Sequence, residues 1–224
     1  MNRFFYTVFK FTFFVLCHIG SMTHAQSSTV LPPRLQQLTE RLAAQPILRA
    51  QFTQSKTIQG LQRPLLSTGQ FLLAQRPVAE GVLWRIEQPI QLSYWLTEQH
   101  MIEIQANGQR QIRRASDMPG FSQIGRIMSS LFRLNQRDLQ QYFTWQYKEQ
   151  GNDGQEAWLL VLTPSAQLAS VIRQVRLGGK QYIEWIEIDE TNQDKLRIQL
   201  SRIQPAQQLN NEERQLIGLS ADGK

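Results

Sequence analysis

Long hydrophobic runs are almost absent from this sequence. The one clear apolar run, Phe11 to Ile19, is too short to cross a bilayer as a helix, which takes roughly 20 residues. It follows the basic residues Arg3 and Lys10 and precedes Thr23-His24-Ala25, a small-residue site typical of signal-peptide cleavage. We therefore expect residues 1–25 to be a secretory signal peptide and the mature chain to be an exported, soluble protein that does not span a membrane.

Cysteine is equally scarce. The sequence has one cysteine, Cys17, and it lies inside the predicted signal peptide. We therefore expect the mature chain to contain none, although an oxidising compartment would permit disulfides. Its stability must then come from packing alone.

A shortage of histidine argues against most catalytic and metal chemistry. Two of the three histidines leave with the signal peptide, and His100 remains in a turn, where an exposed histidine is ordinary. A Ser-His-Asp triad or a metal site needs several such groups to converge. Glu184 and Glu187 point to opposite faces of one expected strand, and the sequence has no GxSxG motif or phosphate-binding glycine loop. We expect no enzymatic activity, no cofactor and no metal.

Charge of one sign is not concentrated anywhere in the chain. The formal net charge is +6, to which Arg3 and Lys10 of the predicted signal peptide contribute two. The other basic residues are scattered along the expected strands, which is typical of a solvated face and not of a nucleic-acid site. We expect no nucleic-acid partner.

Residues 26–224 are long enough to form one sizeable core, so we expect a single domain.

Hydrophobic periodicity is what the sequence does contain. An amphipathic helix is expected over residues 34–44, with Leu35, Leu38 and Leu42 on one side and Pro46 beyond its end. After it, short alternating segments separated by turn signals indicate an antiparallel sandwich or barrel. The expected strands cover residues 49–58, 67–75, 81–88, 91–98, 101–105, 109–114, 143–148, 157–163, 171–177, 181–189 and 195–203.

One helical segment interrupts these strands, at residues 121–134. Its apolar residues form a continuous stripe at helical spacing, made of Ile124, Ile127, Met128, Leu131 and Phe132. A second, short helix is expected to begin at Asn135.

A series of short motifs between residues 34 and 204 resembles the LolA-like periplasmic carriers of lipoproteins. The motifs, in order, are Phe52-x-Gln54, Ser67-x-Gly69, Arg76-Pro77, Gly81-x-x-Trp84, Pro89 and Leu162-x-Pro164, followed by the closing strand LRIQLSRI. The resemblance implies a mostly β fold: a half-open antiparallel β-barrel with an amino-terminal helix and a helical lid over its concave face.

The resemblance also implies that the concave face is a hydrophobic cavity for acyl chains. In GVLWRIEQP, residues 81–89, alternation places Val82, Trp84 and Ile86 on one face. The lid is expected to include the apolar stripe of 121–134. Family members hold the lid closed with an arginine that precedes a proline, which makes Arg76 the candidate latch. The expected cavity residues are Phe71, Leu73, Val82, Trp84, Ile86, Tyr94, Leu96 and Ile102, and ordinary core packing is the alternative for each.

The function that the resemblance implies is transport. A monomeric carrier of this kind would collect an acylated lipoprotein or another lipid from an inner-membrane ABC transporter or other exporter. It would then pass its cargo across the periplasm to an outer-membrane receptor. The same half-barrel occurs in a periplasmic regulator of envelope stress, so a lipid- or lipoprotein-sensing regulatory protein is the alternative. That regulator has a further carboxy-terminal domain, and the residues after Pro205 are too few for one, so we favour the carrier.

Overall fold

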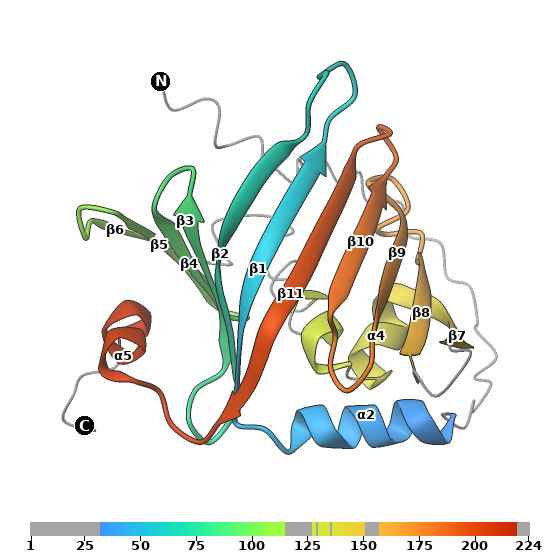
Figure 1. Ribbon diagram of the computed structural model, residues 1–224, viewed down its shortest axis with the longest axis horizontal. Coiled ribbons are helices and arrows are strands. Elements are labelled where there is room, and N and C mark those ends of the chain that lie inside the picture. Colours follow the sequence, from blue (N-terminus) through green and yellow to red (C-terminus); the bar gives the residue numbers. More distant parts are fainter. Residues whose placement is uncertain (1–31, 115–126, 129, 135, 151–156, 219–224) are drawn as a thin grey trace.

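Figure 1 shows the computed structural model of the chain, which describes residues 32–114, 127–128, 130–134, 136–150 and 157–218. The predicted signal peptide lies outside the described residues, as do Ile124 and the first part of the expected lid helix. The division of the chain into a signal peptide and one domain therefore stays a prediction.

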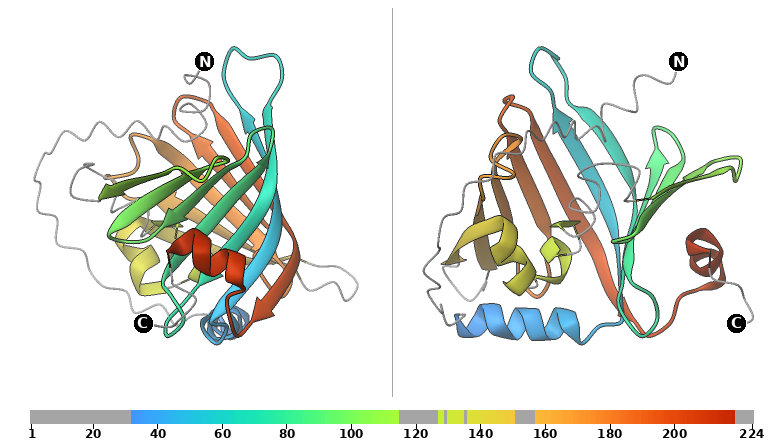
Figure 2. Two further views of the ribbon diagram at one scale, coloured as in Figure 1. Left: turned by 90° about the vertical axis from the view of Figure 1, so that its left-hand side faces the viewer. Right: turned by 180° about the vertical axis from the view of Figure 1, so that it is seen from behind.

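Eleven strands form one antiparallel sheet. They are β1 Ile47–Thr57, β2 Leu65–Ala74, β3 Gly81–Gln88, β4 Leu92–Leu96, β5 His100–Gln105, β6 Arg110–Arg114, β7 Phe143–Gln150, β8 Ala157–Pro164, β9 Ile172–Gly179, β10 Trp185–Glu190 and β11 Lys195–Ala206. The first strand pairs with the last, so the order is β6-β5-β4-β3-β2-β1-β11-β10-β9-β8-β7. The sheet curls, and β6 and β7 remain its two edges (Figure 2). The predicted fold class, a half-open antiparallel barrel, is confirmed.

All eleven expected strands are present, with ends that differ by a few residues. The strands could be predicted because hydrophobic and polar residues alternate along them. Along β1, the buried residues Leu48, Ala50 and Phe52 alternate with more exposed ones. The largest difference is at β10, which was expected from residue 181. It starts later because Gly178 and Gly179 extend β9, and the turn closes so tightly that a Cβ on Gly179 would lie 2.1 Å from the carbonyl oxygen of Tyr182.

Two of the helices match expectation. α2, Pro33–Ala43, begins with a proline in its first turn and buries Leu35, Leu38 and Leu42 against the main core. α4, Gln136–Tyr142, is the short helix expected from Asn135. Seen from behind in Figure 2, α4 and the helical residues that precede it lie in front of the sheet, on its concave side, while α2 crosses below the strands.

A third helix, α5 Asn211–Ile217, was not predicted. It lies outside the sheet beside β3, β4 and β5 (Figure 1). Asn210 and Glu213 form a reciprocal capping box at its start, and Gly218 ends it with a φ of 80°. Because α5 covers the convex face, the sheet is buried on both sides there. The second core consists of Ile47, Leu72, Ala74, Leu83, Trp95, Ile102, Ile104, Leu209 and Ile217.

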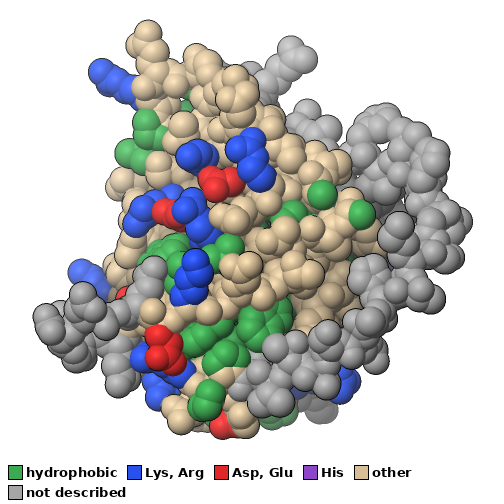
Figure 3. All heavy atoms as spheres, turned by 90° about the vertical axis from the view of Figure 1, so that its right-hand side faces the viewer, with side chains coloured by type: hydrophobic (Ala, Val, Ile, Leu, Met, Phe, Trp, Pro, Cys, Tyr) green, Lys and Arg blue, Asp and Glu red, His purple; other side chains and the backbone are tan. Residues whose placement is uncertain are grey.

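Charged side chains of both signs alternate on the convex surface of β9, β10 and β11. Arg176 pairs with Glu187 at 3.1 Å and with Asp189 at 3.2 Å, and Arg197 pairs with Glu187 at 2.8 Å. Figure 3 shows the molecule from the right-hand side of Figure 1, where several Lys and Arg side chains lie next to Asp and Glu side chains. Partly exposed pairs of this kind each contribute about 0 to 1 kcal/mol, so they do more for solubility than for stability.

Candidate functional site

The concave face of β2, β3 and β4 is a continuous hydrophobic floor. Strand register aligns Phe71, Trp84 and Tyr94 in one row across these strands. Leu73, Val82 and Leu96 form the next row, and Ile86 lies beyond Trp84 on β3. These seven predicted cavity residues all belong to the main core, and none is more than 7% exposed. The floor is therefore covered in this conformation.

Ile102, the eighth residue predicted to line the cavity, lies on the other side of the sheet. It pairs with Trp95, and both belong to the second core beneath α5. Met101 takes the concave position instead, because the β4–β5 hairpin pairs it with Leu96. A shift of one residue in register moves every side chain of a strand to the opposite face, and that shift is the error in the prediction.

Four aromatic rings form the centre of the concave face. Trp84 stacks on Phe52 with ring centroids 4.1 Å apart and meets the edge of Phe71 at 5.9 Å. Phe132 lies 4.3 Å from Phe71 and 6.5 Å from Trp84. Phe52 was not among the predicted site residues, although it is buried between the exposed residues Gln51 and Thr53 of β1, and that alternation was visible in the sequence.

The described part of the expected lid packs on this floor. Phe132, Leu131 and Ile127 are buried in the main core, and Met128 is partly buried against it. Phe132 packs against Phe71 and Trp84, so this described part of the lid covers those two rings.

Among the described residues, the partner of Arg76 is Glu80 and not residue 127–128 or 130–134 of the expected lid. Its side chain is 82% exposed, and its ion pair is with Glu80, at 2.6 Å. Glu80, in the loop between β2 and β3, also accepts a hydrogen bond of 3.1 Å from Arg133 of the lid segment. Among the described residues, Glu80 and Arg133 therefore form an ion pair between the β2–β3 loop and the lid segment, and the arginine is on the lid. Sequence reasoning missed this pair because 53 residues separate its members.

The charges around Glu80 keep it ionised. Burial raises the pKa of its carboxyl, but the hydrogen bonds and charges of Arg133 and Arg76 together outweigh burial and lower the pKa below its ordinary value. The Arg133 side chain is only 20% exposed, and its Nε and Nη2 atoms are buried without hydrogen-bond partners. Glu80 is thus the carboxylate that compensates the arginine charge at the edge of the lid.

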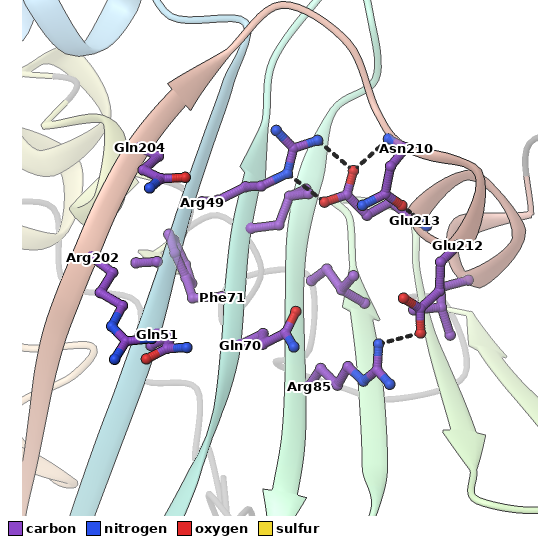
Figure 4. Close-up of a pocket in the computed structure, with 14 residues that line it drawn as sticks. Arg49, Gln51, Gln70, Phe71, Arg85, Arg202, Gln204, Asn210, Glu212 and Glu213 are labelled. Carbon is purple, nitrogen blue, oxygen red and sulfur yellow. Dashed lines mark hydrogen bonds and ion pairs between the residues drawn. The ribbon is translucent and has the colours of Figure 1, made fainter.

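A second concavity, of about 260 Å³, lies on the convex face between the sheet and α5 (Figure 4). Arg49 of β1 makes a bidentate pair with Glu213 at 2.5 and 2.6 Å, and Arg85 of β3 pairs with Glu212. The hydrogen bonds that Arg49 donates to Glu213 raise the pKa of Arg49 despite burial. Amide and guanidinium groups line much of the remainder, from Gln51, Gln70, Arg202 and Gln204. Such a polar lining suits an acyl chain poorly.

Neither a cluster of metal ligands nor a membrane-spanning helix occurs among the described residues. Within those ranges, no three His, Cys, Asp or Glu side chains gather as metal ligands would. None of the described helices is both long and apolar enough to cross a bilayer.

Comparison with known proteins gives distant similarity in structure. No family model matches the sequence, and no curated protein matches it as a relative. The structure is similar to that of a LolA superfamily protein from Nitrosomonas europaea, at 11% identity and a TM-score of 0.42, over 80% of this chain and 94% of that one. It is also similar to a DUF1329 family protein from Desulfovibrio piger, at 11% identity and a TM-score of 0.44, over 83% and 97% of the two chains.

The Mycobacterium tuberculosis lipoprotein LppX is a further similar structure, at 11% identity and a TM-score of 0.44, over 78% of this chain and 98% of that one. A LolA superfamily structure is therefore among those that the chain is similar to, as the motif series implied. At such low identity and TM-scores the likeness assigns no role, so the function must be argued from this chain's own residues.

Proposed function

We propose that the protein is a non-enzymatic carrier that shields acyl chains of a lipoprotein, or of another lipid, between its concave sheet and its lid. The observation that carries this proposal is the contact of Phe132 with Phe71 and Trp84, which lays an apolar segment over an unbroken apolar floor. The Glu80–Arg133 ion pair lies at the edge of that segment. In a carrier, such a pair sets how readily the lid opens.

Acyl binding would exchange one set of apolar contacts for another. Burying an acyl chain contributes about 0.8 kcal/mol per methylene, so a long chain can replace the contacts that the lid loses when it moves. One polar connection among the described residues is the partly exposed ion pair between Glu80 and Arg133. Pairs at this exposure are weak enough to break when cargo or a partner protein competes for the lid.

The predicted signal peptide supports a periplasmic location for this exchange. A monomeric carrier there would load at an inner-membrane ABC transporter or other exporter and unload at an outer-membrane receptor. Bound acyl chains are lost to water only at a large hydrophobic cost, so release is expected to need such a receptor. These locations and partners are part of the proposal.

The test is to produce the full chain with its predicted leader, recover the periplasmic protein and identify extracted lipids by mass spectrometry. We expect acyl-containing lipid in near-stoichiometric amount. Leu131→Asp, which puts a charge under the lid, should lower lipid per folded molecule. Leu66→Asp is the matched control, because Leu66 is 62% exposed on β2, and it should keep the lipid. Absence of acyl lipid from the parent and failure to take any up from vesicles would contradict the proposal.

A further inference from the structure

The concave face becomes polar at one end of β1 and β2. On β1, Gln54 and Lys56 continue the inward face of Phe52, because alternate residues of a strand share a face. On β2, Ser67 is the direct cross-strand partner of Gln54. All three side chains are buried: Gln54 and Lys56 are 6% exposed and Ser67 is 8% exposed. This polar end adjoins Phe52, on which Trp84 stacks.

The hydroxyl of Ser67 is buried without a hydrogen-bond partner. Native proteins rarely leave a buried polar atom in that state, so such an atom calls for a reason. Directly opposed residues on antiparallel strands have Cβ atoms about 5 Å apart, which places the Gln54 amide within reach of any group that Ser67 binds. Together they offer hydrogen-bond donors beside an apolar floor.

The neighbouring charges disfavour an anion at this end. The Lys56 ammonium is bound by Glu190 and lies 3.8 Å from Asp194. Asp194 also accepts a hydrogen bond of 2.9 Å from the backbone N–H of Gln59. Two carboxylates against one ammonium leave a net negative charge, so a carboxylate or phosphate brought to Ser67 would be repelled. A neutral hydrogen-bond acceptor would not.

We propose that Ser67 and Gln54 bind the carbonyl of an ester- or amide-linked acyl chain, and that the site selects such chains over free fatty acids. The inference rests on the proposed carrier function and names its substrate class. The Ser67 hydroxyl donates to the carbonyl oxygen, and the Gln54 amide lies beside it. Gln54 and Phe52 are two residues apart, about 7 Å along the strand, so the first methylenes of the chain fall on Phe52 and Trp84.

The experiment measures binding of 1-monomyristoylglycerol and of myristate to the mature protein at neutral pH, by displacement of a fluorescent acyl probe below the micellar concentration of each ligand. We expect the parent to bind the ester more tightly than the acid. Ser67→Ala should weaken ester binding about 3- to 10-fold, the value of one hydrogen bond, and change myristate binding less than about 2-fold.

Ser93→Ala is the matched control. Ser93 is a serine at 7% exposure on β4 whose cross-strand partners are Arg85 and Ile104, so it lies on the convex side. It should leave both affinities unchanged. Ser67→Ala should not lower the unfolding temperature, because its hydroxyl has no partner in the ligand-free protein.

Two results would overturn the inference and leave the carrier function standing. One is equal affinity of the parent for ester and acid. The other is a Ser67→Ala protein that loses thermal stability and keeps its ester affinity, since Ser67 would then be a structural hydroxyl. Failure of the parent to bind either ligand would overturn the carrier proposal and the inference with it.

Discussion

Replacing Glu80 with glutamine tests whether the Glu80–Arg133 pair holds the lid. The pair joins Oε1 and Nη1 at 3.1 Å, with side chains 32% and 20% exposed. Partly exposed ion pairs contribute up to about 1 kcal/mol, so Glu80→Gln should cost at most about 1 kcal/mol of closed-state stability. That loss raises the ratio of open to closed lid by up to about 5-fold, because each 1.4 kcal/mol is a factor of ten.

The assay is stopped-flow quenching of tryptophan fluorescence by a brominated monoacylglycerol, whose capture requires the lid to open. We expect Glu80→Gln to capture the probe up to about 5-fold faster than the parent. Arg76→Gln is the control: its side chain is 82% exposed, although it pairs with the same carboxylate, so its rate should stay within about 2-fold. If Arg76→Gln accelerated capture as much as Glu80→Gln, or if Glu80→Gln had no effect, the Glu80–Arg133 pair would not be what holds the lid closed.

Two further predictions concern pH and the outer helix. The folded-state pKa of Glu80 lies below its ordinary value of 4.5. The ion pair therefore stabilises the closed lid fully above pH 4.5, and this stabilisation is lost as the pH falls through the lowered pKa. Capture by the parent should therefore accelerate below pH 4.5, while Glu80→Gln should show a flat profile, and a flat parent profile would count against this titration. Glu213→Ala removes both the capping box of α5 and the pair with Arg49, so urea denaturation should show a loss of about 1 to 3 kcal/mol. Probe affinity should be unchanged, because α5 lies on the convex face; a weakened affinity would contradict that separation of the two faces.

Much of the sheet could be predicted from the sequence because strand signals are local. Alternation between buried and exposed residues marks β1, and turn residues such as Asn107-Gly108 separate its successors. In β3, Val82, Trp84 and Ile86 were assigned to one face, and the structure places all three in the main core.

Alternation failed where both faces of the sheet are buried. In β5, Met101 and Ile102 are both buried, one in each core, so hydrophobicity alone does not identify the inward residue. The hairpin register decides, and it depends on the loop between Leu96 and Met101. The cause of the double burial is α5, whose own signal was present in the capping residues Asn210 and Glu213 and in Gly218.

The contacts that complete the site could not be read from local patterns. Arg76 precedes a proline as in the resembling family, yet it points to solvent, and the lid pairs with Glu80 four residues later. The contacts of Phe132 with Phe71 and Trp84 likewise join segments far apart in the sequence. The curl of the sheet and the path of the chain over it determine which of these distant residues come into contact.

The most direct test of the carrier function is whether a bound acyl chain reaches Trp84. We predict that a brominated monoacylglycerol quenches the tryptophan fluorescence of the protein saturably, as the chain replaces Phe132 against the indole. The chain has five tryptophans, so the assignment needs Trp84→Phe, which keeps most of the apolar bulk and should unfold within about 1.5 kcal/mol of the parent. That variant should lose a large share of the quenching. Saturable quenching that persists undiminished in the variant, or no quenching in the parent, would contradict an acyl site on the concave face.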